Sequence, residues 1–370
     1  MTTPATSRAA ARVLDRRLST QRLTSAPLGS AAEVVRLLGC VQSQDRPSAF
    51  YSLGLRTRAA TASSVQAELD AGTIIRTHIL RPTWHFVAPE DLRWMLGLTS
   101  PKIVRGMAAR HRELALDERT IECGFQALEK LLRGKNFLSR KELGPMGAAH
   151  GITAGPQLGH LLMLAELRGL ICSGPSDGGQ HRYALIDEWV PPAPALDPDR
   201  ATARLVHRFF AGHGPASLPD LTRWCTVTQA EARIALAEIG DALEKIEFDG
   251  TELWFDPSVT ARRSRTPEAL LLPVFDEATL TYLRLSFPRT AGHPFEGLAG
   301  PGMSDLFNGS VLVDGVNVGT YSRTVGADTV QVRLRFAGSA TAEQRRRAKV
   351  GAEQIGAFHG RGVDLVDQAG

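Results

Sequence analysis

The sequence predicts an α+β fold: three tandem winged-helix domains in a curved arrangement, followed by a C-terminal β-rich domain. One reason is a unit of helix, turn, helix and hairpin that recurs about 60 residues further along the chain. Another is the change near residue 267, after which apolar and polar residues alternate as they do in strands. A chain of 370 residues has room for about two to four domains of ordinary size.

The clearest copy of this unit is predicted for residues 117–196. The segment FLSRKELGPMGAAHGI predicts a short helix and a turn. The next segment, TAGPQLGHLLMLAELRGLI, carries Leu158, Leu161 and Leu162 at the spacing of an amphipathic helix. A glycine-rich turn then leads into a strand, which completes the winged-helix order.

Further copies are predicted on both sides. Residues 197–266 contain the helical segment DPDRATARLVHRFFAGHG, the Thr-capped helix of TQAEARIALAEIG and a hairpin that turns at Asp249-Gly250. Residues 1–116 form a modified copy, with RTHILRPTWHFV as the expected wing. Residues 267–370 form the β-rich domain, in which a Thr-capped last helix closes the chain.

The composition excludes several classes of protein. With 43% hydrophobic and 22% charged residues, the chain is too apolar for intrinsic disorder. It has no signal-peptide core and no run of the roughly 18 apolar residues that a membrane span needs. The 4 cysteines form no CxxC pair and the 10 histidines no HxxxH pair. We therefore expect a soluble cytoplasmic protein with no metal, no cofactor and no disulfide framework.

The charges are distributed unevenly along the chain. Residues 1–116 hold 16 lysines and arginines against 8 acidic residues, whereas the remaining residues hold 27 against 31. A cationic block of this kind indicates an anionic partner, most often nucleic acid. A solvated basic surface is an equally compatible interpretation of the block alone.

The segment GCVQSQDRPSAFYSLGLR holds the strongest candidates for chemistry. Gln42 and Gln44 are two residues apart, so on a strand or in a turn their amides share one face. Pro47 is typical of a helix start and predicts a helix from about Pro47 to Leu55. On spacing alone, the alternative that Gln-Ser-Gln-Asp is a polar loop capping this helix is favoured.

The carboxylate next to the glutamines has two candidate roles. Asp45 could assist a reaction as a base. Capping of the following helix, or pairing with Arg46, is the favoured role.

A second candidate segment is the expected wing. If it is a hairpin, alternation places His78, Trp84 and Phe86 on one side and His85 on the other. His85 is a candidate for lining an active site. The alternatives are core packing for the aromatic residues and a structural hydrogen bond for His85.

Arginines of the same wing are candidates for binding nucleic acid. Arg76 and Arg81 are predicted to contact phosphates, which take half or more of the hydrogen bonds in protein–DNA interfaces. Elsewhere in the chain, Asp276 and Glu277 form a carboxylate pair after a predicted strand. Capping of a turn is the simpler interpretation of that pair.

Over nearly its whole length the chain resembles the winged-helix DNA glycosylases of the AlkZ and YcaQ type. Four segments carry the resemblance: GCVQSQDRPSAFYSLGLR, IIRTHILRPTWHFVAPEDL, LLPVFDEATLTY and VLVDGVNVGTYSR. The AlkZ branch has a Q-x-Q motif and the YcaQ branch Q-x-D. Gln42 and Gln44 match the AlkZ branch, with Ser43 at a position that is often aliphatic in the family.

The resemblance implies a monofunctional DNA glycosylase that removes N7-alkylated guanines and leaves an abasic site. Members of the AlkZ branch handle bulky natural-product adducts or interstrand crosslinks and protect the producing cell. The implied catalytic residues are Gln42 and Gln44. The implied partner is double-stranded DNA containing alkylated purines, bound by a monomer without an obligate protein partner, in bacterial cytoplasm and on the nucleoid. Candidates for DNA contact or active-site lining are Asp45, Arg46, Arg76, His78, Arg81 and His85.

Two neutral amides are chemically sufficient for this reaction. Alkylation at N7 makes the guanine cationic, so it departs as a neutral base and needs no strong general acid. Glycoside hydrolases use two carboxylates for comparable work, one of them as the acid. Amide oxygens can instead accept hydrogen bonds from a water and orient it below the sugar C1′, and positioning alone lowers a barrier by several kcal/mol. The hypothesis predicts that uracil and normal bases are not released.

Two other functions compete with this one. A non-catalytic winged-helix transcriptional regulator would use the same modules to bind DNA, but such proteins typically combine one winged helix with a dimerisation helix or a ligand pocket. The sequence has three units and no long heptad seam. A plain interaction scaffold is disfavoured by the cationic block.

Overall fold

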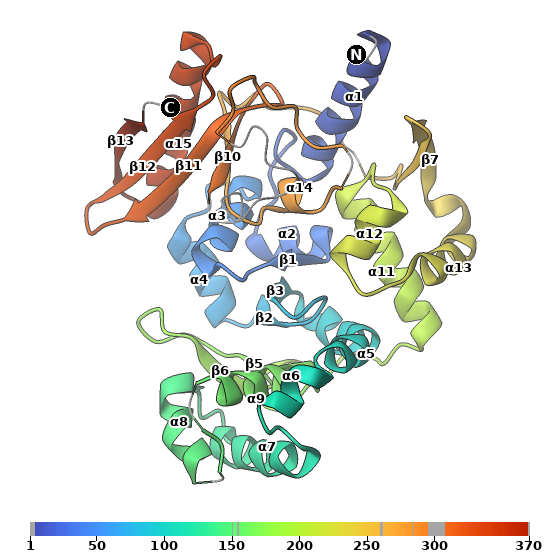
Figure 1. Cartoon of the computed structure of the whole chain (residues 1–370), viewed down its shortest axis with the longest axis vertical. Coiled ribbons are helices and arrows are strands. Elements are labelled where there is room, and N and C mark those ends of the chain that lie inside the picture. Colours follow the sequence, from blue (N-terminus) through green and yellow to red (C-terminus); the bar gives the residue numbers. More distant parts are fainter. Residues whose placement is uncertain are drawn as a thin grey trace. The chain divides into compact units, whose positions relative to one another are not determined.

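The structure, a computed structural model, describes residues 4–149, 151–153, 155–259, 262–283, 285–294 and 308–368. The chain forms two compact units (Figure 1). Unit 1 comprises residues 1–66, 207–223 and 239–370, and unit 2 comprises residues 67–206 and 224–238. The four domains expected from the sequence remain a prediction.

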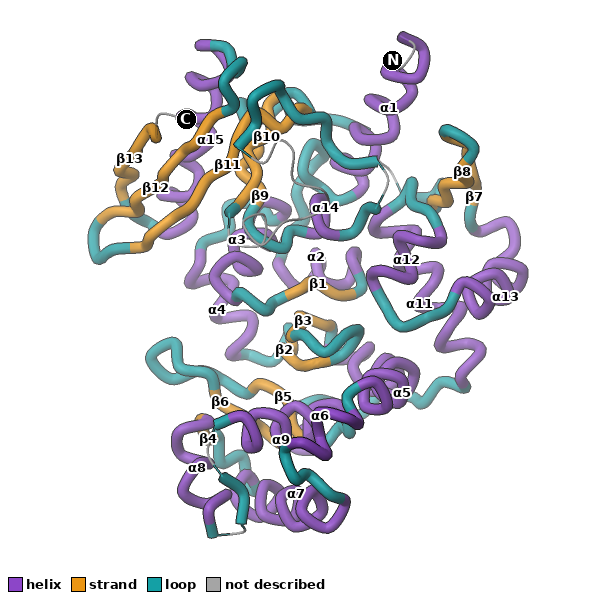
Figure 2. The backbone as a smooth tube through the Cα atoms, in the orientation of Figure 1, coloured by secondary structure: helices purple, strands orange, loops and turns teal. Residues whose placement is uncertain are grey.

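A five-stranded sheet dominates the C-terminal part of unit 1 (Figure 2). Its order is β13-β12-β11-β10-β9. The strands are β9 (Leu270–Leu272), β10 (Gly309–Val313), β11 (Val316–Val325), β12 (Thr329–Phe336) and β13 (Gly362–Gln368). The β10–β11 hairpin turns at Asp314 and Gly315, both with positive φ, as the sequence predicts.

The last helix, α15 (Ala342–His359), packs against this sheet. Thr341 caps it through a capping box with Gln344, which confirms the predicted cap. The expectation that this helix closes the chain is wrong. Gly360 ends the helix in the left-handed conformation, and the chain then returns as β13, parallel to β12.

The N-terminal part of unit 1 consists of α1 (Pro4–Thr20), α2 (Ala31–Leu38), β1 (Cys40–Gln42) and α3 (Arg46–Arg56). The short helix α14 (Glu277–Leu280) belongs to the same unit. Apolar residues of α1 share one hydrophobic cluster with β9, β10 and α14: Leu14, Leu18, Leu23, Leu270, Leu272, Ala278, Phe287 and Leu312. The two ends of the chain therefore fold around a common core.

Unit 2 contains the hairpin of β2 (Ile75–His78) and β3 (Trp84–Val87), followed by helices and a second small sheet. The sheet order is β4-β6-β5. The elements are α5 (Pro89–Gly106), α6 (Ala108–Glu113), α7 (Glu118–Leu132), β4 (Leu138–Ser139), α8 (Arg140–Ala148), α9 (Pro156–Leu167), β5 (Ile171–Ser173), β6 (Arg182–Leu185) and α10 (Ile186–Trp189).

The order of elements from α7 to β6 agrees with the unit predicted for residues 117–196. The predicted stripe of α9 is buried in the core of unit 2, with Leu158, Leu161 and Leu162 each at most 3% exposed. The number of winged-helix domains in the chain remains a prediction.

Several elements cross the division between the units along the chain. They are α4 (Ala62–Asp70), α11 (Pro198–His213), α12 (Leu218–Trp224) and α13 (Gln229–Ile239). A 3-10 turn, η1 (Gly240–Ala242), follows α13 and leads to the hairpin of β7 (Glu244–Phe248) and β8 (Thr251–Phe255). Asp249 and Gly250 form its turn, again as predicted.

Candidate functional site

The two glutamines of the Q-x-Q motif flank a turn at the end of β1. Gln42 is the last residue of β1 and is 7% exposed. Its backbone N–H donates a hydrogen bond to Oε1 of Glu277 at 3.0 Å. Its side-chain oxygen is buried and has no hydrogen-bond partner among the described residues. After the buried Ser43, Gln44 is exposed.

The residues after Gln44 start helix α3. Asp45 is the N-cap residue, and its carboxylate accepts the N–H of Ser48 at 2.8 Å. Arg46 is the first helical residue, and its guanidinium carbon lies 5.7 Å from the centroid of the Phe50 ring. The predicted helix start and the capping role of Asp45 are thus confirmed. Because the carboxylate of Asp45 accepts the helix N–H, it fixes the turn that carries Gln44.

A cavity of about 620 Å³ opens beside Gln44 within unit 1. One wall is the glutamine turn and the start of α3, and the other is formed by the loop after β9 and by strands β10 and β11. The lining residues are Gln44, Asp45, Pro47, Ser48, Val274, Phe275, Gly309, Tyr321, Ser322, Arg323 and Val325. This cavity holds one glutamine of the motif together with a cation and a phenol.

The cation and the phenol are held in place by the surrounding side chains. The guanidinium of Arg323 lies 5.7 Å from the ring centroid of Tyr51 and 3.4 Å from Oγ of Ser48. The Tyr321 hydroxyl donates to the carbonyl of Leu271 at 3.2 Å. Burial raises the pKa of Tyr321, so this phenol stays protonated at neutral pH. The wall of the cavity therefore combines the guanidinium of Arg323 and a neutral phenol with the carboxylate of Asp45.

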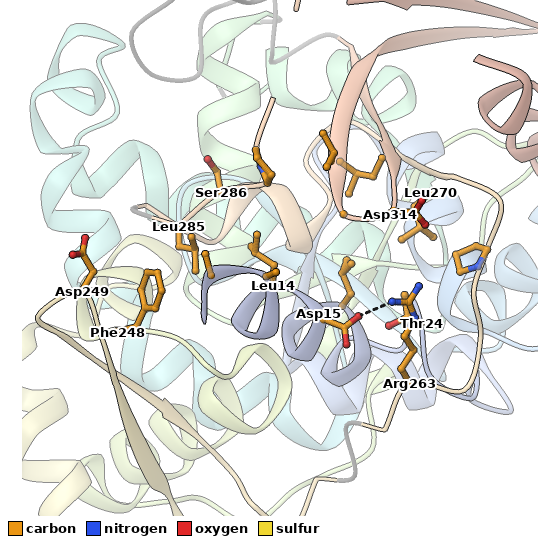
Figure 3. A pocket seen from close by; sticks show the side chains of 18 residues that line it. Leu14, Asp15, Thr24, Phe248, Asp249, Arg263, Leu270, Leu285, Ser286 and Asp314 are labelled. Atoms are coloured by element: carbon orange, nitrogen blue, oxygen red, sulfur yellow. Dashed lines mark hydrogen bonds and ion pairs between the residues drawn. The ribbon is translucent and has the colours of Figure 1, made fainter. Parts of the chain in front are cut away.

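A second cavity of about 620 Å³ in unit 1 lies along α1 (Figure 3). Leu14, Leu270 and Leu285 contribute apolar walls, and Asp15 pairs with Arg263 at 3.2 Å. Neither glutamine is among its lining residues. We therefore place the candidate site at the cavity beside Gln44.

The remaining candidates of the sequence lie on the β2–β3 hairpin of unit 2. His78 pairs across the strands with Trp84, and Arg76 pairs with Phe86, so these four side chains share one face. His85 lies opposite Thr77 on the other face, as alternation predicts. Units 1 and 2 each hold one cluster of candidate residues.

Arg76 and His78 are buried in unit 2. Arg76 is 5% exposed, its guanidinium lies 4.2 Å from the Trp84 ring centroid, and one nitrogen is 2.9 Å from Nδ1 of His181. His78 forms a short contact through Nδ1 with the carboxylate of Glu166, which also accepts Nε1–H of Trp84 at 3.3 Å. A buried cation, a carboxylate and tilted ring contacts thus stabilise this hairpin.

Arg81 and His85 differ in their surroundings. Arg81 is half-buried in the turn between β2 and β3. His85 is 1% exposed, and its Nδ1 lies 2.8 Å from the carbonyl oxygen of Thr83. This contact is the kind of local structural hydrogen bond that the sequence left as an alternative for His85.

The residues at the candidate cavity that the sequence did not single out include Phe275, Tyr321 and Arg323. All three lie in the segments LLPVFDEATLTY and VLVDGVNVGTYSR that carry the resemblance. Those segments are more than 200 residues from the glutamines in the chain, so spacing gives no signal that they meet.

The described residues contain neither a cluster of metal ligands nor a helix suited to span a membrane. Within them, no group of three or more His, Cys, Asp or Glu side chains has the arrangement of a metal site. None of the helices described has both the length and the apolar character needed to cross a bilayer.

Known proteins similar to this chain agree on one family. The family described as DNA glycosylase AlkZ-like matches residues 35–358. The interstrand DNA cross-link repair glycosylase of Streptomyces sahachiroi is 24% identical over 259 residues. That alignment spans 63% of this chain and 66% of the relative, slightly less than two thirds of its length.

The fold of this chain also agrees with that of a solved structure. The solved structure of Streptomyces sahachiroi DNA glycosylase AlkZ superposes with a TM-score of 0.74 at 20% sequence identity, covering 96% of this chain and 99% of that one. At this identity the likeness establishes a shared fold. The family match extends over the glutamine turn, the β2–β3 hairpin and the loop and strands that line the candidate cavity. The chain belongs to the AlkZ-like DNA glycosylase family.

Proposed function

We propose that this protein hydrolyses the N-glycosidic bond of N7-alkylated guanine in double-stranded DNA and leaves an abasic site. Gln42 and Gln44 act as the catalytic residues, without a covalent enzyme intermediate and without a cofactor. The proposed lesions are bulky natural-product adducts or interstrand crosslinks, in line with the name of the Streptomyces sahachiroi relative. The corresponding role is self-resistance of a bacterial cell, exercised on the nucleoid by a monomer.

The observation that carries the proposal is the burial and hydrogen bonding of the two glutamine side chains. The side-chain oxygen of Gln42 is buried and unpartnered among the described residues, while Gln44 lies exposed at a cavity two residues away. Leaving a buried acceptor without a hydrogen bond costs about 1–3 kcal/mol, and a bound water or a catalytic role is among the explanations for such a group. A water bound by this oxygen would supply the missing partner.

The chemistry follows from the charge of the substrate. An N7-alkylated guanine already carries the positive charge that a general acid would otherwise supply. The remaining requirement is a water held below C1′ while the sugar becomes cationic, and amide oxygens meet it by accepting hydrogen bonds from that water. Neutral amides deprotonate water weakly, which limits the reaction to bases that are good leaving groups. Uracil and unmodified bases should therefore stay attached.

Binding of DNA is proposed to use the cationic N-terminal block. The residues 1–116 carry an excess of 8 positive charges, which favours association with phosphates. Side chains of both units are proposed to contact DNA or to support such contacts: Asp45 and Arg46 in unit 1, and Arg76, His78, Arg81 and His85 in unit 2. Arg81 is the best placed of the hairpin arginines for phosphate contact, because Arg76 is 5% exposed and engaged with Trp84 and His181.

The proposal is tested with a duplex that carries a single N7-methylguanine. Wild-type protein in excess should convert the lesion to an abasic site, detected as alkali-dependent strand cleavage. Gln42→Ala and Gln44→Ala should each lower the single-turnover rate by about 100-fold while leaving duplex binding within about twofold. Gln126, an exposed glutamine of α7 hydrogen-bonded to Glu122 at 3.1 Å, provides the matched control, and Gln126→Ala should retain the wild-type rate.

Two results would overturn the proposal. Release of uracil at a comparable rate would show that leaving-group activation is not what limits the reaction. Sequence-specific binding to undamaged DNA without base release would favour a transcriptional regulator. Parallel duplexes carrying bulky N7 adducts and an interstrand crosslink then identify the lesion class.

A further inference from the structure

The loop after β9 contributes both to the cavity and to the core behind it. Val274 and Phe275 line the cavity beside Gln44. Phe275 has φ +62°, a left-handed conformation that is unfavourable for a bulky side chain. The next two residues, Asp276 and Glu277, are carboxylates that are 0% and 1% exposed. Strained backbone followed by two buried charges indicates that this loop is held in one conformation by its contacts.

Glu277 binds the strand that carries the first glutamine. Its Oε1 accepts the backbone N–H of Gln42 at 3.0 Å, a hydrogen bond between residues 235 positions apart. Its Oε2 accepts the hydroxyl of Thr281 at 3.1 Å and lies 3.3 Å from Nε2 of His213. The carboxylate thus fixes the last residue of β1 through the main chain and leaves the side chain of Gln42 free to act.

His213, in turn, holds Glu277 in place. Its Nδ1 lies 3.2 Å from the carbonyl oxygen of Phe209, which can only accept a hydrogen bond, so Nδ1 carries hydrogen. The imidazole also stacks on the Phe209 ring at a centroid distance of 4.9 Å, and Tyr282 donates to the carbonyl of His213 at 2.7 Å. These contacts restrict the imidazole and the carboxylate it meets.

Asp276 binds the helix that follows the second glutamine. Each of its two oxygens accepts a hydrogen bond from a nitrogen of Arg56 at 2.8 Å, and Oδ2 also accepts a hydrogen bond from the hydroxyl of Ser52 at 2.7 Å. Asp276 caps α14 as well, accepting the N–H of Ala278 at 2.9 Å. Ser52 and Arg56 lie on the last turns of α3, the helix that Asp45 starts.

We propose that Asp276 and Glu277 are positioning residues for the glycosylase reaction: Glu277 fixes the end of strand β1, Asp276 fixes the helix α3 that follows the glutamine turn, and together they set the relative placement of the Gln42 and Gln44 amides. The inference rests on the proposed function of those amides. Because the anchors are adjacent residues, strand β1 and helix α3 are attached to one point. Neither carboxylate has to touch substrate. A displacement of about 1 Å in a positioned group lowers a rate by about 100-fold, so loss of an anchor is expected to reduce the chemical step and not DNA affinity.

The test compares Glu277→Ala with Glu277→Gln on the N7-methylguanine duplex. Glu277→Ala should lower the single-turnover rate by about 10- to 100-fold, with the dissociation constant for the duplex within about twofold of wild type. Glu277→Gln keeps an oxygen that can accept the N–H of Gln42, so its rate should recover to within about threefold of wild type. Such recovery by the isosteric variant distinguishes positioning from acid–base chemistry by Glu277.

Asp256 offers a matched control in the same unit. It is 8% exposed, its Oδ2 lies 3.3 Å from Nε2 of His207, another histidine of α11, and it accepts the N–H of Ser258 at 2.8 Å. Asp256→Ala therefore removes a buried carboxylate paired with a histidine, as Glu277→Ala does. It should lower thermal stability while leaving the single-turnover rate within about twofold of wild type.

Hydrogen exchange at the glutamine turn gives a readout that does not need activity. Glu277→Ala should accelerate exchange of the Gln42 amide by at least about tenfold beyond any change in global stability, and Asp256→Ala should not. If the wild type releases base and Glu277→Ala matches its rate, the positioning role is wrong and the proposed function stands. If the wild type releases no base, the proposed function fails. An unchanged Gln42 exchange rate in Glu277→Ala overturns the anchoring role in either case.

Discussion

Replacement of Arg56 by methionine should destabilise unit 1 more than most single substitutions. Arg56 is 0% exposed, and its guanidinium binds both oxygens of Asp276 at 2.8 Å, the carbonyl of Ser52 at 2.9 Å and Oε1 of Gln21 at 2.9 Å. Methionine fills most of the volume of the arginine stem. The substitution therefore removes the charge and leaves the ionised Asp276 buried.

The magnitude follows from the loss of one partner in a buried pair. Two unit charges about 4 Å apart attract by about 4 kcal/mol at an effective dielectric constant near 20, and removal of one partner of a buried pair costs about 3–5 kcal/mol. Asp276 retains the hydroxyl of Ser52 at 2.7 Å and the N–H of Ala278 at 2.9 Å. We therefore expect the free energy of unfolding of unit 1 to fall by about 3–4 kcal/mol, toward the lower end of that range.

Hydrogen exchange measured by mass spectrometry can localise this loss to one unit of the chain. Peptides from α3 should exchange roughly 100- to 1,000-fold faster in Arg56→Met than in wild type, because exchange tracks the free energy of opening. Adding Asp276→Leu removes the isolated charge and should recover at least about 2 kcal/mol. A change below about 1 kcal/mol in Arg56→Met, or a double variant no more stable than the single one, would refute the reasoning.

Two further outcomes are expected. A Cβ on Gly54 would lie 2.4 Å from Cε2 of Phe358, so Gly54→Ala should destabilise unit 1 by about 1–3 kcal/mol in urea unfolding. Gly97 is the control, because it is exposed in α5 and a Cβ there would meet nothing within 4 Å. Gly97→Ala should stabilise the protein by about 1 kcal/mol. Burial, and then the charge of Arg323, lower the pKa of His359 to about 4. Since the folded pKa lies below the unfolded value of about 6.5, the contribution of neutral His359 to stability is complete above pH 6.5 and is lost as the pH falls toward 4. His359→Gln should flatten the fall in melting temperature between those pH values, and an unchanged slope would contradict the assignment.

The parts of the fold that the sequence predicts well are those determined by neighbours in the chain. The hairpin turns at Asp249-Gly250 and Asp314-Gly315, the cap at Thr341 and the cap at Asp45 all involve contacts within a few residues. Their residue types are selected for one local backbone geometry. The apolar spacing of α9 likewise predicts that Leu158, Leu161 and Leu162 are buried, although the structure also buries four consecutive residues, Leu164–Leu167, so the helix is not restricted to one apolar face.

The environment of the glutamines could not be predicted in this way. Sequence reasoning indicates a turn cap for Asp276, and the structure confirms that cap on α14. It gives no indication that Asp276 also pairs with Arg56, 220 residues earlier, or that Glu277 meets Gln42. Arginine is rarely buried completely, so nothing in the local pattern around Arg56 marks it as a core residue.

The missed strand β13 has a comparable cause. Its 7 residues, GVDLVDQ, are mostly exposed, and the strand forms by parallel pairing with β12 after the helix α15. Parallel pairing depends on a free sheet edge and a crossover helix. The crossover helix α15 directly precedes β13 and the free edge is strand β12, so both lie outside the short segment, whose own residues predict little.

The discontinuity of unit 1 has a consequence for how the protein is made. The glutamine turn leaves the ribosome early, whereas Glu277 is added 235 residues later, roughly 12–47 s afterwards at ordinary bacterial translation rates. Until then, strand β1 has neither its acceptor for the Gln42 amide nor the sheet that shares a core with α1. Nascent or prematurely terminated chains that stop before β9 thus contain the whole Q-x-Q motif without the partners that hold it.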